Sequence, residues 1–247
     1  MGQPIWIVRR GDYSEYIIIS ILRFLLSEFE RIFGEEAMKR EPCVVYNDPQ
    51  AGCPMLVINS SPVKIQLALS SLSSWSQMIF QLSHELCHYA MRQCKDNKDF
   101  TLSWFEEICC EAMSLYALHW AADHWDRCEL YSKDSGYGVK NRIYLNKELN
   151  KSGTGGFQAC TSINLMMAYS PCENRESHRD ERNALYYEIV KDPLLFRCIC
   201  DYQKYLDSNK ITINFEKWER NDANPMIRFL HSLQPYKKVI LIEKEGP

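Results

Sequence analysis

The sequence has no apolar run long enough to cross a membrane and no large excess of one charge. Its most apolar stretch, Ile17 to Leu26, is interrupted by Arg23, whereas a membrane-spanning helix needs about 18 to 20 apolar residues in succession. The formal net charge is −3 over 247 residues, which gives no electrostatic case for binding nucleic acid or an anionic membrane surface. We therefore expect neither a nucleic acid nor a membrane among the partners.

The sequence also lacks paired CxxC motifs, internal repeats and a recognisable export signal. Its 11 cysteines are scattered and odd in number, and they form no CxxC pairs, since Cys198 and Cys200 have CxC spacing. The first residues, Met1-Gly2-Gln3-Pro4, are not a basic region followed by an apolar run, which is what a secretory signal requires. These features predict reduced thiols and a cytoplasmic protein.

The most specific pattern is His84-Glu85-Leu86-Cys87-His88, an HExxH motif. Two histidines four apart on an α-helix lie one turn apart on the same face, so both imidazoles can reach one metal ion. Glu85 points about 100° round the helix from His84, which suits a carboxylate that takes a proton from water beside that metal. With 6 histidines in the chain, chance produces this motif with odds of roughly one in a hundred. The motif predicts one Zn²⁺ ion and hydrolytic chemistry.

The surroundings of the motif predict two helices. Ser74-Trp75-Ser76-Gln77 is a capping box, after which apolar residues recur at helical spacing to about residue 93. Ser103-Trp104-Phe105-Glu106 is a second capping box, and on the helix that it opens Glu107 and Glu111 are four apart and share a face. Catalytic zinc usually takes three protein ligands and leaves one position for water, so a third ligand is expected near the second helix.

In this segment, from Ser74 to Trp120, the chain resembles the gluzincin superfamily of zinc metallopeptidases, the thermolysin-like and aminopeptidase-N-like enzymes. Their pattern is HExxH, then 18 or 19 residues, then a ligand glutamate; here 18 residues separate His88 from Glu107. Trp104-Phe105-Glu106-Glu107 is similar to the W-x-N-E segment of the aminopeptidases, although Ile108 replaces the glycine that follows it there. The resemblance implies that Glu107 is the third ligand and that Glu111 orients His84. The chain is also similar in size to the small intracellular HExxH proteins that cleave repressors.

Other metal schemes fit the spacing less well. A metzincin needs HExxHxxGxxH, but Met91 and Cys94 stand at the glycine and the last histidine. Glu106 remains a possible ligand, although its capping role competes with that. Cys110 and Cys87 could be recruited to a structural zinc site, but free cysteine is more often a small buried apolar residue, so we expect both to pack in the core.

The expected fold class is α+β, with two lobes. Residues 1–131 are expected to form a zinc-binding catalytic lobe, and residues 132–247, beyond a segment rich in Ser, Gly and Asp, a mainly helical lobe that closes the cleft. The gluzincin resemblance implies a small antiparallel sheet before the HExxH helix, whose edge strand binds an extended peptide. Expected strands are 5–8, 43–46, 55–58, 63–69 and 239–242, and expected helices are 12–34, 74–93, 104–125, 161–169, 180–191, 193–206 and 225–233.

The predicted activity is hydrolysis of a peptide or protein substrate by a zinc-activated water, with Glu85 as general base and then general acid. Such a site also needs a donor for the developing oxyanion, which in gluzincins is a His or Tyr of the C-terminal lobe. Candidates in this chain are Tyr137, Tyr144, Tyr169 and His178. The sequence leaves open a regulatory or protein-binding module that retains the zinc-peptidase fold, and a switch protease that cleaves a single partner. It contains no signal for substrate preference, endo- or exopeptidase action, or oligomeric state.

Overall fold

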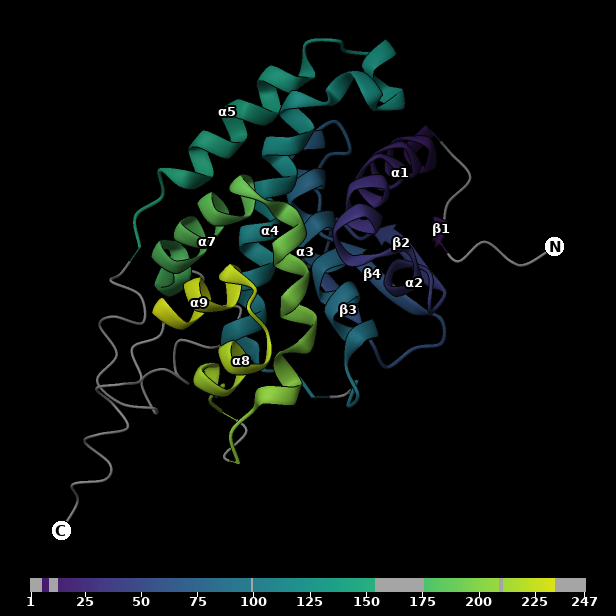
Figure 1. Ribbon diagram of the computed structural model, residues 1–247. Helices are drawn as coiled ribbons and strands as arrows, with labels where there is room; N and C mark the ends of the chain where they lie inside the picture. The colour runs from purple at the N-terminus through teal and green to yellow at the C-terminus, as the bar shows by residue number, and fades with distance from the viewer. Residues whose placement is uncertain (1–5, 9–12, 99, 154–175, 209–210, 234–247) are drawn as a thin grey trace. The chain divides into compact units, whose positions relative to one another are not determined.

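The computed structural model describes residues 6–8, 13–98, 100–153, 176–208 and 211–233, and these form an α+β fold, as the sequence predicts (Figure 1). The described α-helices are α1 (Tyr13–Phe33), α2 (Glu35–Met38), α3 (Trp75–Cys94), α4 (Ser103–Asp123), α5 (Tyr137–Leu149), α7 (Arg179–Lys191), α8 (Phe215–Asn221) and α9 (Pro225–Ser232). The 3₁₀-helical segments are η1 (Trp125–Arg127), η2 (Glu129–Ser132) and η5 (Pro193–Tyr205). Within the described residues, none of these helices is long and apolar enough to span a membrane.

The sheet has four strands in the order β1-β2-β4-β3. Their bounds are β1 (Trp6–Val8), β2 (Cys43–Asn47), β3 (Met55–Val57) and β4 (Val63–Leu67). The expectation of an antiparallel sheet is wrong for most of it, because β1 pairs parallel with β2, and β2 parallel with β4. Parallel neighbours need a crossover connection, and α1 and α2 provide it between β1 and β2. Only the edge strand β3 is antiparallel to its neighbour.

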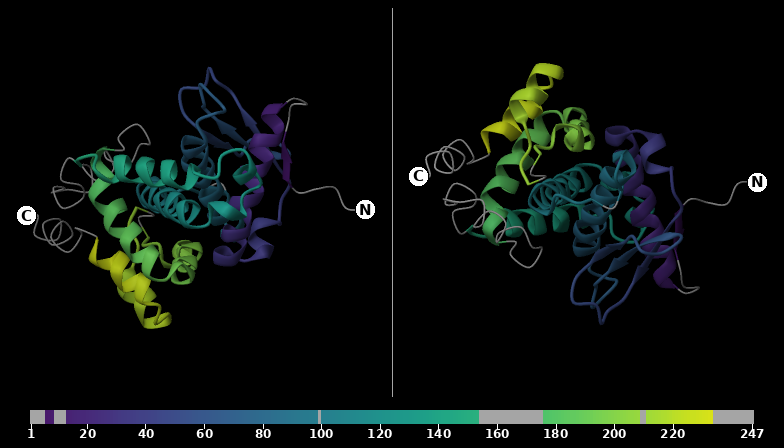
Figure 2. Two further views of the ribbon diagram at one scale, coloured as in Figure 1. Left: turned by 90° about the horizontal axis from the view of Figure 1, so that it is seen from above. Right: turned by 90° about the horizontal axis from the view of Figure 1, so that it is seen from below.

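The alternation seen in β4 fixes which face of the sheet is buried. Val63, Ile65 and Leu67 are almost completely buried, whereas the residues between them are half-buried, because successive side chains of a strand point to opposite faces. Helix α3 packs against β3 and β4, and α1 packs against α3. In both views of Figure 2, the purple and blue segments that form α1 and the sheet lie side by side.

Two side-chain amides hold the chain where β4 ends. The Gln81 side chain on α3 accepts a hydrogen bond from the Ala68 N–H (2.9 Å) and donates to the Ala68 carbonyl (3.2 Å). Asn47, the last residue of β2, makes the equivalent pair of bonds to Leu69, at 2.9 and 3.0 Å. Both backbone groups of each residue are therefore satisfied by a side chain that stands in for a neighbouring strand.

The chain divides into two compact units, residues 1–94 with 113–149 and residues 95–112 with 150–247. This grouping differs from the expected boundary at residue 131, because α5 belongs to the first unit and residues 95–112, which include Glu107, belong to the second. There the Tyr137 hydroxyl accepts a hydrogen bond from the Ser76 N–H (3.2 Å), and the Ser76 hydroxyl donates to Asn141 (2.7 Å). The first of these bonds caps the N-terminus of α3, whose first N–H groups have no partner within the helix.

Each unit has its own apolar core. In the first, Ile21, Leu25 and Phe29 of α1 are almost completely buried. In the second, the core is built around Phe196, Tyr202 and Trp218, with the Trp218 ring stacked on Tyr205 at 5.1 Å between centroids. The green-to-yellow helices α7, α8 and α9 of this unit lie together in Figure 1.

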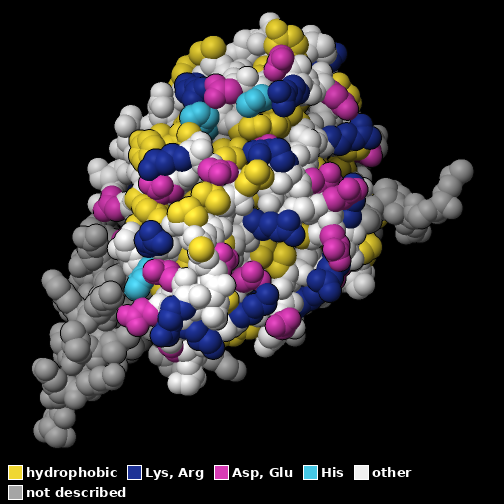
Figure 3. Space-filling view, in the orientation of Figure 1, with side chains coloured by type: hydrophobic (Ala, Val, Ile, Leu, Met, Phe, Trp, Pro, Cys, Tyr) yellow, Lys and Arg dark blue, Asp and Glu magenta, His cyan; other side chains and the backbone are white. Residues whose placement is uncertain are grey.

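Most expected elements coincide with observed ones to within two residues, although the expected helix 193–206 is the 3₁₀-helical segment η5. Among the described α-helices, three were not predicted: α2, α5 and α8, whose sequences begin next to turn-forming residues. The expected helix 161–169 and the strand 239–242 lie outside the described residues. On the face drawn in Figure 3, Lys and Arg side chains alternate with Asp and Glu side chains, as a net charge of −3 allows.

Gly138 lets α5 approach the end of α4 closely. A Cβ atom at this position would lie 2.7 Å from the Ala122 carbonyl oxygen and 3.4 Å from the Trp125 Cβ, so backbone would have to shift. We expect Gly138→Ala to lower the free energy of unfolding by about 1–3 kcal/mol, even though alanine is intrinsically better than glycine in a helix by about 1 kcal/mol. Chemical denaturation measures this change.

The matched control is Gly136→Ala, where the nearest atom, Asp134 Oδ1, lies at 3.5 Å from the added Cβ. That variant should unfold close to the wild type. A Gly138→Ala protein as stable as the wild type would contradict the close-approach argument.

Candidate metal centre

Helix α3 brings the two motif histidines together. The Nε2 atoms of His84 and His88 are 3.2 Å apart, and the ring centroids are 4.9 Å apart. His84 is 3% exposed, and His88 is half-buried. Two nitrogen ligands held at about 2.05 Å from a tetrahedral ion lie about 3.3 Å from each other. The observed spacing therefore suits two ligands of a single tetrahedral metal.

Helix α3 is held at both ends within its own unit. Near its start, the bonds of Ser76 to α5 and of Gln81 to the sheet fix the turns that precede His84. Directly after His88, the Tyr89 hydroxyl donates to the Glu41 carbonyl, and Arg92 pairs with the Glu41 carboxylate at 2.6 Å. Burial raises the pKa of Tyr89, so its hydroxyl stays protonated as the donor. These contacts limit the rotation of the helix that presents the imidazoles.

The third predicted ligand joins them. One ligand atom each from His84, His88 and Glu107 lies within 4.8 Å of the others. Glu107 is half-buried in the first turns of α4. Two imidazoles and one carboxylate are the donor set of many catalytic zinc sites, and the same set accepts cobalt or manganese. The three residues thus form a possible metal-binding site, and their chemistry fits a divalent transition metal.

Glu85 lies between the histidines on α3, and its side chain is 3% exposed. Glu85 follows His84 directly on α3, about one turn before His88, and is not one of the three residues of the cluster.

Glu111, the residue expected to orient His84, has a cationic partner that the sequence did not reveal. Arg182 on α7 donates from Nη1 to Glu111 Oε2 at 3.1 Å, and the two side chains are 3% and 2% exposed. The sequence contains no signal for this pair, because Arg182 is 71 residues from Glu111 and looks like any charged residue of an amphipathic helix.

The four candidate oxyanion donors occupy different places. The Tyr137 hydroxyl caps α3 at Ser76, about 12 Å along the helix axis from His84 at 1.5 Å per residue. Tyr144 is half-buried, and its ring lies 6.1 Å from that of Phe80, one turn before His84. His178 is 2% exposed, directly before α7. Tyr169 lies outside the described residues.

The alternative ligands are placed differently. Cys87 and Cys110 are completely buried in the core, as packing predicts, and neither belongs to the three-residue cluster. Glu106 is bonded instead to Lys95, to Tyr202 and to the Leu102 N–H. Glu106 therefore does accept a backbone N–H at the start of α4, as a capping box predicts, but from Leu102, the residue before the expected cap Ser103.

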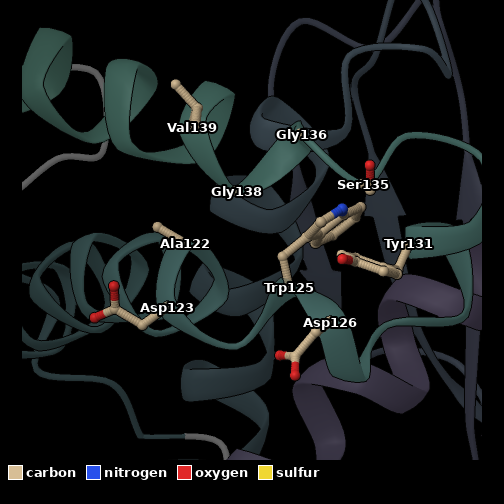
Figure 4. Close-up of a pocket in the computed structure, with 9 residues that line it drawn as sticks. All are labelled: Ala122, Asp123, Trp125, Asp126, Tyr131, Ser135, Gly136, Gly138 and Val139. Atoms are coloured by element: carbon tan, nitrogen blue, oxygen red, sulfur yellow. The ribbon is translucent and has the colours of Figure 1, made fainter.

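A separate pocket lies at the other end of α4, where Figure 4 shows Ala122, Asp123 and Val139 on one side and Trp125 with Tyr131 on the other. Its lining residues are Ala122, Asp123, Trp125, Asp126, Tyr131, Ser135, Gly136, Gly138 and Val139. Asp123 is about 24 Å along the helix from Glu107, at 1.5 Å per residue. Its carboxylate pairs with Arg142 and with His119, so the pocket is distinct from the histidine cluster.

Comparison of the chain with protein-family models, with curated proteins and with solved structures finds no match. The HExxH motif and the three-residue cluster are therefore the features of this chain that indicate a function.

Proposed function

We propose that this protein is a zinc-dependent metallopeptidase that hydrolyses peptide bonds, with the metal held by His84, His88 and Glu107. The observation that carries the proposal is the cluster itself, in which ligand atoms from two helices lie within 4.8 Å of one another. The HExxH spacing and the following glutamate resemble those of the gluzincins, and the donor set supports zinc as the metal. A restricted, intracellular substrate range is part of the proposal.

When bound at this donor set, zinc supplies a Lewis acid and lowers the pKa of water toward about 7. Residues of the chain carry out the proton transfers. The Glu85 carboxylate takes a proton from the attacking water and delivers it to the leaving amine as the C–N bond breaks. The buried pair of Glu111 and Arg182 holds a carboxylate one turn from Glu107. We assign to this carboxylate the orientation of His84, since a partner of that kind fixes the tautomer of a ligand histidine.

The sheet offers an edge for an extended peptide. Strand β3 is an edge strand and is antiparallel to β4, and its first residue, Met55, is 49% exposed. A peptide that adds to such an edge gains main-chain hydrogen bonds irrespective of its side chains. This arrangement supports a peptide as the substrate of the proposed enzyme.

The test is a survey of new protein N-termini in cells that express either the wild type or Glu85→Gln. This substitution keeps the three metal ligands and removes the proton acceptor, so the purified variant should retain zinc. General acid–base catalysis contributes about 10²–10⁴-fold to rate, so we expect cleavage to fall by at least 10²-fold. Termini that appear only with the wild type would give the substrate and its cleavage site together.

The matched control is Glu216→Gln, the same chemical change at an exposed position of α8, which should cleave like the wild type. If the wild type and Glu85→Gln give identical termini while both hold zinc, the peptidase proposal is wrong. That result would favour a regulatory or protein-binding module that retains the metal site. Cleavage of one protein alone would identify a switch protease.

A further inference from the structure

A buried ion pair stands directly beside the third ligand. Lys95 is the first residue after α3, and Glu106 precedes Glu107 on the first turn of α4. Their side chains are each 2% exposed, and Lys95 Nζ bonds to Glu106 Oε1. The pair therefore joins the chain at the end of the motif helix to the turn that carries the ligand carboxylate.

The same carboxylate oxygen has two further donors. Glu106 Oε1 accepts from the Leu102 N–H (3.3 Å) and from the Tyr202 hydroxyl. Burial and the charge of Glu106 raise the pKa of Tyr202, so this hydroxyl is a permanent donor. Lys95 also donates to the Phe100 carbonyl at 3.1 Å. The groups of this network satisfy one another in the interior of the second unit.

Two described residues between α3 and α4 are held by Gln203 of η5, the segment that also carries Tyr202. The Gln203 amide nitrogen donates to the Asn97 carbonyl (3.1 Å) and to the Phe100 carbonyl (3.3 Å). The Trp104 indole N–H donates to the Ile211 carbonyl at 2.9 Å. The first turn of α4 is thus fixed by contacts more than 90 residues away in the sequence.

Stability alone is a poor explanation for this network. A buried ion pair is often no more stabilising than apolar residues of the same volume, because both charges lose their hydration. What such a pair does provide is a single geometry, since its partners are satisfied in only one arrangement. A single geometry matters most one residue away from a metal ligand, where a small rotation of the helix moves the carboxylate.

We propose that Lys95, Glu106 and Tyr202 are positioning residues that fix Glu107 for metal binding, so that metal affinity and coordination geometry depend on the Tyr202 hydroxyl. This inference rests on the proposed metal site. It adds to that site three residues that do not touch the metal. In the W-x-N-E segment that this chain resembles, Glu106 stands where asparagine would be, which fits a carboxylate recruited here to pair with Lys95.

The test compares Tyr202→Phe with Tyr116→Phe. Each removes one hydroxyl that donates to a buried carboxylate, that of Glu106 or that of Glu28. Tyr116 is nevertheless about 13 Å along α4 from Glu107, at 1.5 Å per residue. Zinc affinity is measured by competition with a chromophoric chelator, and the visible absorption of the Co²⁺-loaded proteins reports coordination geometry. Loss of an indirect partner of a metal site typically lowers affinity about 10–100-fold.

We expect Tyr202→Phe to bind zinc at least tenfold more weakly, with an altered Co²⁺ spectrum, and Tyr116→Phe to match the wild type in both. Equal weakening in the two variants would indicate general loosening and would overturn the inference. Should Tyr202→Phe not fold, the double variant Lys95→Met/Glu106→Gln removes both charges together. If the variant that folds binds zinc with wild-type affinity and shows the wild-type Co²⁺ spectrum, the inference is wrong, although the proposed metal site stands. Absence of zinc binding by the wild type would instead remove the proposed function itself.

Discussion

His88→Ala is expected to abolish tight zinc binding and the thermal stabilisation that zinc gives to the wild type. The substitution removes one of three ligands, so its effect should exceed the ~10–100-fold loss caused by removing an indirect partner. Zinc at about 1,000 times its dissociation constant adds about 4 kcal/mol to the stability of a protein that binds it only when folded. For a chain of this length that is roughly 8–16 °C in Tm, and the variant should show little of it.

The measurement is a pair of thermal unfolding curves, one with zinc and one with chelator, together with metal analysis of the purified protein. The matched control is His119→Ala, since His119 is a partly exposed histidine on α4 that pairs with Asp123 outside the cluster. It should respond to zinc like the wild type. Equal zinc stabilisation of His88→Ala and the wild type would exclude this histidine as a ligand.

The second large effect is expected for Arg182→Met. This change leaves the buried Glu111 carboxylate without its cation, and removing one partner of a buried pair costs about 3–5 kcal/mol of stability. Urea unfolding in the presence of a chelator separates this loss from any effect of bound metal. The double variant Arg182→Met/Glu111→Gln should recover most of the stability, because no isolated charge remains in the interior.

The control for this experiment is Lys204→Met in the same unit, where the lysine of the Lys204–Asp201 pair is 57% exposed. An exposed pair contributes little, so this variant should unfold with the wild type. If Arg182→Met and Lys204→Met have the same free energy of unfolding, the Glu111–Arg182 contact does not contribute to stability.

The sequence predicted the residues of the candidate site better than the residues that contact and position them. His84 and His88 could be assigned because helical geometry alone brings residues four apart to one face, and Glu107 because the gluzincin resemblance supplied the spacing. Arg182 and Tyr202 could not be assigned, since each meets its carboxylate only after distant parts of the chain fold together. Local patterns carry no information about which surface-like Arg or Tyr will become buried beside a glutamate.

For the helices and strands, too, local sequence patterns predicted some features, whereas others depend on contacts between distant parts of the chain. The strand positions followed from alternation and from turn residues, but their directions did not, since the antiparallel expectation came from the resemblance and β1, β2 and β4 are parallel. Helix α5 was missed because Gly136 and Gly138 indicated a loop between lobes. In the structure Gly138 is instead needed for close packing against Ala122.

The paired amides of Gln81 and Asn47 have a consequence for how the sheet can grow. A strand end with open N–H and carbonyl groups is a template for another chain, but at Ala68 and Leu69 those groups already bond to side chains. On the side of β4 that faces β3, a strand that adds beside β3 therefore cannot extend its pairing onto Ala68, the residue that follows β4. Such a strand can pair with β3 only. The Gln81 side chain therefore sets the point at which an extended segment bound along this edge must stop pairing.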